Sequence, residues 1–169
     1  AIKRSCDVYF YEIARKLGVD RLSKTAKKFG LGEKVFDSLL EERSGVVPST
    51  KWKKKFIGQN WYLGETLHSG IGQGYFLSTP MQLCLMSAQI ANGGYKIKPR
   101  IIFDKDDKNN NLKEYIEYKN NNPDKTISTD ILLSNFKLKT LFRNQENINF
   151  VKDAMFASTN EPGGTSYKS

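Results

Sequence analysis

The sequence is poor in histidine and cysteine, with one of the first and two of the second. A Ser-His-Asp or Cys-His enzyme would have to be built around His68 alone, and a multi-histidine metal site is excluded. The two cysteines, Cys6 and Cys84, lie far apart and form no Cys-x-x-Cys pair. This spacing excludes a disulfide scaffold and a zinc finger. The residues present therefore imply no metal and no organic cofactor.

Long apolar runs are also missing, and none approaches the ~20 residues that cross a bilayer as a helix. Hydrophobic residues make up 38% of the chain and charged residues 27%, which excludes collagen, coiled coil and a fully disordered chain. The 169 residues suffice for the core of one ordinary domain. Both ends look cut, because Ala1 leads directly into a predicted helix and no closing element precedes Ser169.

Positive charge is in excess, and the formal net charge is +9. A basic balance is typical of proteins that bind nucleic acid or an anionic surface. The lysines and arginines are dispersed along the chain, however, apart from one short cluster. That cluster consists of Lys51, Lys53, Lys54 and Lys55. We expect a solvated basic surface, while a non-enzymatic basic module that binds nucleic acid or an anionic surface remains the alternative.

Two helices are predicted near the start of the chain. Apolar residues recur at helical spacing between Asp7, a candidate N-cap, and Gly18, a candidate end. This stripe contains Phe10, Ile13, Ala14 and Leu17. A second helix follows up to Gly30, and the tight link between the two suggests an antiparallel pair. The next residues, 30–48, read as loop, and a short basic helix is expected around Trp52.

The clearest local signal is Thr79-Pro80-Met81-Gln82, a capping box with proline at the first helical position. The helix that follows, Met81–Ala91, is apolar on most sides, so we expect it to be buried, with Cys84 in the core. Residues 95–99 alternate as a strand does. Residues 104–126 are rich in Asp, Lys and Asn and predict a flexible insert or surface loop, and a last helix is expected from about 147 to 158.

The candidate chemistry lies in Ser5-Cys6-Asp7, immediately before the first helix. A hydroxyl and a carboxylate two residues apart at a helix start can both point into a cleft, beside backbone N–H groups that the helix leaves unpaired. Penicillin-interacting enzymes use a Ser-x-Asn or Ser-x-Asp motif of this kind, together with Ser-x-x-Lys and Lys-Thr-Gly. Taken alone, the tripeptide is more often an ordinary N-cap.

The neighbouring residues extend the match. Ser5 to Tyr11 resembles the Ser-x-Asp-x-x-Phe-Tyr opening of the penicillin-binding protein 2 family, the class B elongation transpeptidases. Further blocks that resemble this family follow in the same order: Glu41-Glu42-Arg43-Ser44-Gly45 with Pro48 and Trp52-Lys53; Trp61-Tyr62-x-Gly64-x-Thr66; Gly70-Ile71-Gly72-Gln73-Gly74-Tyr75; Thr79-Pro80-Met81-Gln82; and Asn92-Gly93-Gly94. Pro162-Gly163-Gly164-Thr165 resembles the lead-in to the Lys-Thr-Gly strand.

The resemblance implies the α/β fold of β-lactamases and D,D-peptidases, in which a helical subdomain packs on an antiparallel sheet. Residues 1–169 would then form part of a transpeptidase domain, mostly its helical subdomain and the start of its sheet side. The implied reaction cross-links peptidoglycan stem peptides through a serine acyl-enzyme, and penicillin acylates the same serine. Ser5 matches the motif serine, expected to shuttle protons, and Asp7 matches the third motif position, facing the lysine and the substrate amide.

Two of the three family motifs are missing from the chain. Ser134-Asn135-Phe136-Lys137 has the spacing of Ser-x-x-Lys but lies on the wrong side of Ser5, and Lys-Thr-Gly does not occur. The nucleophile and the Lys-Thr-Gly strand are thus expected outside this chain, which alone should be inactive. A penicillin sensor or a β-lactamase of the same fold is a further alternative, against which the Glu41–Gly45 and Gly70–Tyr75 blocks argue.

The resemblance also implies partners and a location. The expected ligands are stem peptides and β-lactams, and the expected protein partner is the glycosyltransferase of the elongation machinery, with no nucleic acid. The parent protein would act on the periplasmic side of the bacterial inner membrane, anchored by a segment that this chain does not contain.

Overall fold

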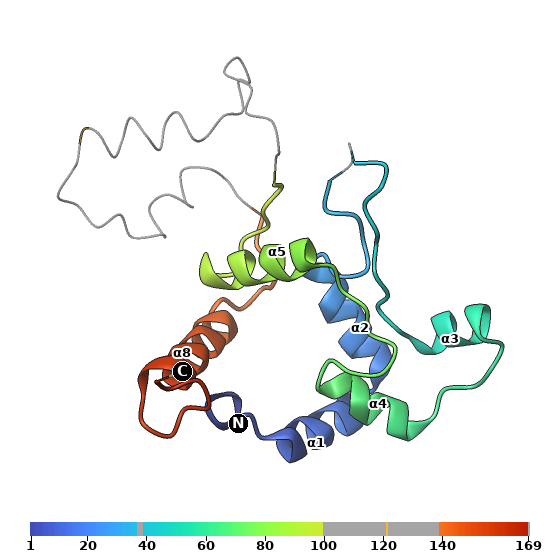
Figure 1. Cartoon of the computed structure of the whole chain (residues 1–169), viewed down its shortest axis with the longest axis horizontal. Coiled ribbons are helices and arrows are strands. Elements are labelled where there is room, and N and C mark those ends of the chain that lie inside the picture. Colours follow the sequence, from blue (N-terminus) through green and yellow to red (C-terminus); the bar gives the residue numbers. More distant parts are fainter. Residues whose placement is uncertain (37–38, 100–120, 122–138, 169) are drawn as a thin grey trace.

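The computed structural model describes residues 1–36, 39–99, 121 and 139–168 (Figure 1). Its elements are η1 (Ile2–Arg4), α1 (Asp7–Leu17), α2 (Val19–Lys28), α3 (Thr50–Phe56), α4 (Leu63–Gly70), α5 (Pro80–Ala91) and α8 (Glu146–Asn160). Within the described ranges, strand pairing is limited to two isolated antiparallel bridges, Val46 with Leu77 and Tyr95 with Thr140. Apart from residue 121, the predicted insert at 104–126 lies outside the described residues, as do Ser134 and Lys137.

The helices follow one another around a ring in the order α1, α2, α5 and α8 (Figure 1). α4 packs against α1 and α2, and α5 contacts α8. α3 lies outside the ring beside α4. α8 also packs on η1, which brings the first and the last residues of the chain together.

The first two helices form as predicted, but they do not form an antiparallel pair. Gly18 alone joins them, with φ of 74° and ψ of 155°, a backbone conformation that suits glycine. In Figure 1, α2 leads away from α1, and α1 packs chiefly on α4. Asp7 is the first residue of α1, not its N-cap; that position belongs to Cys6, whose side chain is exposed.

The short basic helix around Trp52 is confirmed as α3, and so is the predicted capping box of α5. Ser49 Oγ accepts a hydrogen bond from the backbone N–H of Trp52 at 3.1 Å, which begins α3. In α5, Thr79 Oγ1 accepts from the N–H of Gln82 at 3.2 Å, and Gln82 Oε1 accepts from the N–H of Thr79 at 3.0 Å. The side-chain oxygens of these two residues thus accept hydrogen bonds from backbone N–H groups that the helix start would otherwise leave unpaired.

The prediction that α5 buries an apolar core was wrong. The residues that α5 buries are Gln82 and Gln89, seven positions apart and therefore on one face, whereas Cys84 is exposed and Leu83 is 46% exposed. The reason is hydrogen bonding. The amide of Gln82 donates to backbone oxygens of another segment, and so does that of Gln89, so that the polar face turns inward at little cost.

Residues 95–99 make only the beginning of the predicted strand. Tyr95 pairs with Thr140, and the N–H of Lys96 donates to the carbonyl of Lys139 at 2.9 Å. The last predicted helix is confirmed and slightly longer, as α8 from Glu146 to Asn160. Ile148 is its buried apolar residue, while Met155 is 43% exposed.

Candidate functional site

The Ser5–Asp7 segment forms a tight turn between η1 and α1. Ser5 has φ of 46° and ψ of 53°, the left-handed region that residues other than glycine rarely adopt. Its N–H donates to the carbonyl of Ile2 at 3.1 Å, and the N–H of Cys6 donates to that of Ala1 at 3.2 Å. This backbone conformation is unfavourable by itself, so contacts from elsewhere are needed to hold it.

Those contacts come from the turn that follows α8. Gly164 lies so close to the end of α8 that an added Cβ would come 2.2 Å from the carbonyl oxygen of Ser158. The N–H of Gly164 donates to the carbonyl of Glu161 at 3.0 Å. Glycine at this position therefore lets the chain turn tightly back, and the turn presents Thr165 toward η1.

The two turns are joined by side-chain and backbone hydrogen bonds. The hydroxyl oxygens of Ser5 and Thr165 are 2.9 Å apart, and the N–H of Thr165 donates to the carbonyl of Lys3 at 3.0 Å. Lys3 Nζ pairs with Glu161 Oε2 at 2.5 Å. The segment predicted to carry the motif serine thus lies against the Gly163-Gly164-Thr165 segment, although 160 positions separate Ser5 from Thr165.

Asp7 is placed differently from Ser5. It occupies the first turn of α1, where a carboxylate is favoured by the partial positive charge of the helix start. Its side chain is exposed, and no side chain in the described part of the protein pairs with the carboxylate. The structure therefore brings Ser5, and not Asp7, into contact with the C-terminal turn.

The helix that carries Asp7 is fixed in place by α4. Gly70 is the last residue of α4, and a Cβ there would meet the Cβ of Ala14 at 2.5 Å and the carbonyl oxygen of Phe10 at 3.0 Å. Ala14 is 1% exposed. After Gly70 the chain turns through Gly72 and Gly74, both at positive φ, and the N–H of Gln73 donates to the carbonyl of His68.

Residues 1–166 match the family model described as the penicillin binding protein transpeptidase domain. The chain belongs to this family. The peptidoglycan D,D-transpeptidase MrdA of Salmonella typhimurium is 30% identical over 168 residues, which are 99% of this chain and 24% of that protein. MrdA of Escherichia coli K12 is 39% identical over 102 residues, 60% of this chain and 16% of that protein. The chain thus spans about a quarter of the length of the curated relatives that it matches most fully.

Solved structures of the transpeptidase family share the fold. The penicillin-binding protein PBP2 of Helicobacter pylori, in its complex with MreC, aligns over 99% of this chain and 26% of its own, with a TM-score of 0.75 and 29% identity. PBP2 of Pseudomonas aeruginosa in complex with WCK 5153 aligns over 57% of this chain and 21% of its own, with a TM-score of 0.55 and 50% identity. The predicted β-lactamase and D,D-peptidase-like fold is therefore confirmed, and the described part of this transpeptidase chain is mostly helical.

Two of the blocks that resemble the transpeptidase family are coupled through one buried side chain. Gln82, from the Thr79–Gln82 block, is fully buried, and its Nε2 donates to the carbonyl of Glu33 at 2.6 Å and to that of Ser44 at 2.7 Å. Ser44 belongs to the Glu41–Gly45 block. In the same loop, the carboxylate of Glu42 accepts from the N–H groups of Val35 and Phe36. These contacts hold the loop before α3 against the start of α5.

A second coupling surrounds Lys53, which is only 1% exposed. Its ammonium forms an ion pair with Glu65 and lies 4.7 Å from the ring centre of Tyr62 and 5.8 Å from that of Tyr75. Burial raises the pKa of Glu65, but the hydrogen bonds from Lys53 and Tyr62, the charge of Lys53 and a hydrogen bond from Tyr75 together hold this pKa below its ordinary value. Lys53 thereby unites α3, α4 and the loop after α4.

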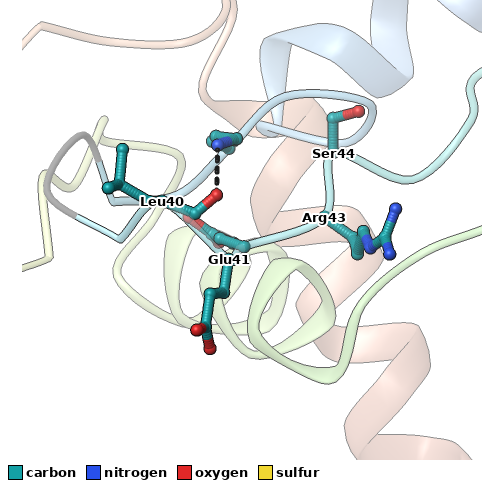
Figure 2. A pocket seen from close by; sticks show the side chains of 6 residues that line it. Leu40, Glu41, Arg43 and Ser44 are labelled. Atoms are coloured by element: carbon teal, nitrogen blue, oxygen red, sulfur yellow. Dashed lines mark hydrogen bonds between the residues drawn. The ribbon is translucent and has the colours of Figure 1, made fainter.

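A surface pocket of about 660 Å³ lies beside the Glu41–Gly45 block. The residues that line it are Lys34, Leu40, Glu41, Glu42, Arg43 and Ser44. Figure 2 shows that the side chains of Glu41 and Arg43 point in different directions, so they offer no convergent set of ligands. Lys34 Nζ donates to the carbonyl of Leu40 at 3.1 Å, which closes this loop on itself (Figure 2).

Sequence reasoning singled out Ser5 but missed the residues that hold it. Thr165 was noted only as part of a glycine-rich segment of the transpeptidase family, and Ser158 and Lys3 carried no signal at all. His68 is exposed and lies in the last turn of α4. Among the described residues there is no cluster of His, Cys, Asp and Glu that could hold a metal ion, and no helix long and apolar enough to cross a membrane.

Proposed function

We propose that this chain is part of a peptidoglycan D,D-transpeptidase that cross-links stem peptides through a serine acyl-enzyme and is acylated by penicillin. The observation that supports this proposal most directly is the 2.9 Å contact between the hydroxyls of Ser5 and Thr165. It places the Ser-x-Asp turn against the segment that resembles the lead-in to the Lys-Thr-Gly strand. A catalytic cleft of this family requires these two segments to be neighbours.

In the proposed reaction the nucleophile is the serine of a Ser-x-x-Lys motif outside this chain. It attacks the penultimate D-Ala carbonyl of one stem peptide and expels the terminal D-Ala, and an amine of a second stem then takes the acyl group. A serine hydroxyl is a weak nucleophile and needs a base and a path for its proton. Ser5 would supply a step of that path, and Asp7 would orient the lysine and the substrate amide.

The domain, the partners and the location belong to the same proposal. Residues 1–169 would be a partial transpeptidase domain, with residues 104–126 as a flexible insert or surface loop. The parent protein would bind stem peptides and β-lactams, would work with the glycosyltransferase of the elongation machinery, and would be anchored to the inner membrane with this domain on the periplasmic side. The complex of the Helicobacter pylori PBP2 with MreC suggests a further protein partner for the parent protein.

A basic module that binds nucleic acid is disfavoured by the position of Lys53. The lysine cluster around α3 would be its best candidate surface, but Lys53 points inward and is paired with Glu65. The remaining members, Lys51, Lys54 and Lys55, are exposed on a helix of seven residues. Binding of nucleic acid needs a continuous positive surface along the phosphate backbone, which three exposed lysines on one short helix do not form.

The test is to sequence the coding DNA on both sides of the segment that encodes this chain. The complete protein is then treated with a fluorescent penicillin. We expect a Ser-x-x-Lys upstream of Ser5, a Lys-Thr-Gly or Lys-Ser-Gly after the Gly164-Thr165 turn, and covalent labelling by a fluorescent penicillin. A persistent acyl-enzyme would distinguish a transpeptidase from a β-lactamase, which releases its product. If the complete protein has no Ser-x-x-Lys, or is not labelled, the catalytic proposal fails.

A further inference from the structure

We infer that Thr165 is a positioning residue for Ser5, holding the Ser5 hydroxyl in the orientation that proton transfer needs. This inference rests on the proposed function. Thr165 lies outside the three catalytic motifs, and its role follows from its contacts in this structure alone.

The position of Thr165 is fixed by a hydrogen bond of its own backbone and by the glycine that precedes it. Its N–H donates to the carbonyl of Lys3 at 3.0 Å, inside the turn that carries Ser5. The close approach of Gly164 to Ser158 determines the path of the turn from the other side. The ion pair between Lys3 and Glu161 ties the same two segments a second time. The threonine hydroxyl is therefore held relative to Ser5 by backbone geometry.

The hydroxyls of Ser158, Thr165 and Ser5 form a chain. The oxygens of Ser158 and Thr165 are 3.3 Å apart, and those of Thr165 and Ser5 are 2.9 Å apart. Each hydroxyl can donate one hydrogen bond and accept two. Thr165 Oγ1 also lies 3.5 Å from the carbonyl oxygen of Lys3, a longer contact than the 2.9 Å to Ser5. When Ser158 donates to Thr165 and Thr165 donates to Ser5, the hydrogen of Ser5 stays free for the reacting groups. Thr165 thus orients the proton of Ser5 without touching the substrate.

The left-handed backbone of Ser5 makes this support necessary. The φ of 46° is unfavourable for serine, and a short polar turn without external contacts would relax to another conformation. The contact with Thr165 stabilises the Ser5 side chain in that backbone state. Loss of the threonine hydroxyl should therefore misplace the proton path while the helices around it stay folded.

The experiment uses the complete parent protein and compares Thr165→Val with Thr165→Ser. Valine keeps the shape but removes the hydroxyl, whereas serine keeps the hydroxyl. We expect Thr165→Val to lower the second-order rate of acylation by a fluorescent penicillin about tenfold and to shift its pH profile, with thermal stability unchanged. Thr165→Ser should stay within about twofold of the unmodified protein. Ser158→Ala, which removes the first donor of the chain, should lower the rate by about threefold.

The matched control is Thr159→Val, because Thr159 is an exposed threonine in the last turn of α8. Its hydroxyl donates to the carbonyl of Phe156 and accepts from Asn160 Nδ2, both within α8. It should leave the rate and its pH profile unchanged. Normal acylation by Thr165→Val would overturn the inference and leave the proposed function standing. If Thr165→Val and Thr165→Ser lowered the acylation rate equally and also lowered thermal stability, Thr165 would act through packing and not through its hydroxyl. That result would also overturn the inference. No acylation of the unmodified protein would overturn the proposed function itself, and the inference with it.

Discussion

Gly70 of α4 and Ala14 of α1 lie so close together that a Cβ on Gly70 would come 2.5 Å from the Cβ of Ala14. This contact is where α4 meets the helix whose first residue is Asp7. Two helices can approach this closely only where one of them lacks a side chain. The contact therefore sets the distance between α1 and α4, and through α1 it supports the candidate catalytic turn.

Gly70→Ala is the substitution that tests this contact. The added methyl would overlap both Ala14 and the carbonyl oxygen of Phe10, so we expect unfolding to require about 1–3 kcal/mol less free energy. Chemical denaturation of the complete transpeptidase domain measures the change. Because α1 would shift, acylation by a fluorescent penicillin should slow as well.

Gly64 provides the matched control, since it lies in the same helix and a Cβ there would meet nothing within 4 Å. Gly64→Ala should be neutral or stabilising by up to about 1 kcal/mol, because alanine favours the helix. The double variant Gly70→Ala with Ala14→Gly should recover much of the lost stability. A stability of Gly70→Ala equal to that of Gly64→Ala would show that α1 and α4 are not packed this closely.

Gln82→Ala should be among the most damaging single changes in the chain. It would leave the carbonyls of Glu33 and Ser44 and the N–H of Thr79 without their partner in a fully buried position. We expect a loss of about 2–4 kcal/mol in the free energy of unfolding. Gln59→Ala, at an exposed position between α3 and α4, is the control and should change stability by less than about 0.5 kcal/mol.

Acid should weaken the link between α3 and α4. The pKa of Glu65 lies below its ordinary value in the folded protein, so Glu65 binds a proton more readily when the chain is unfolded. Its stabilising contribution is therefore complete above the unfolded pKa and is lost as the pH falls through the lower, folded pKa. Glu65→Gln should be less stable at neutral pH and should lose less stability between about pH 6 and pH 3.

The measurement is the free energy of unfolding as a function of pH, compared between Glu65→Gln and the unmodified protein. Glu41→Gln is the control, because Glu41 is exposed and forms no ion pair with the other described residues. Its pH dependence should match that of the unmodified protein. If Glu65→Gln and the unmodified protein lost stability in parallel across the acid range, the ion pair with Lys53 would not contribute to stability.

Ser5→Ala tests the role proposed for the motif serine. Without the hydroxyl, proton transfer to and from the nucleophile loses one of its steps, and we expect acylation by a fluorescent penicillin to fall by at least about 100-fold. Ser87→Ala, at an exposed position of α5, is the control and should acylate normally. Unimpaired acylation by Ser5→Ala would assign Ser5 to the structure of the turn alone.

Local signals in the sequence were sufficient for most helices. The capping box at Thr79–Gln82, the serine before α3 and the glycine after α1 each act through hydrogen bonds or backbone angles within a few residues. The segment Ser5–Tyr11 and the later blocks were likewise enough to name the family, because their order and spacing are visible in one chain. What these local signals could not indicate is which face of α5 turns inward.

That choice was made by contacts between distant segments. The inward face of α5 depends on carbonyls of residues 29, 33 and 44, and the pairing of α1 with α4 depends on the missing side chain of Gly70. The contact of Ser5 with Thr165 spans 160 positions. The amino-acid sequence by itself therefore determined most helices and the family, since helix caps and family motifs each consist of a few neighbouring residues. Only the tertiary structure decided the neighbours of Ser5 and Lys53, because hydrogen bonds and ion pairs between remote residues exist only once the chain is folded.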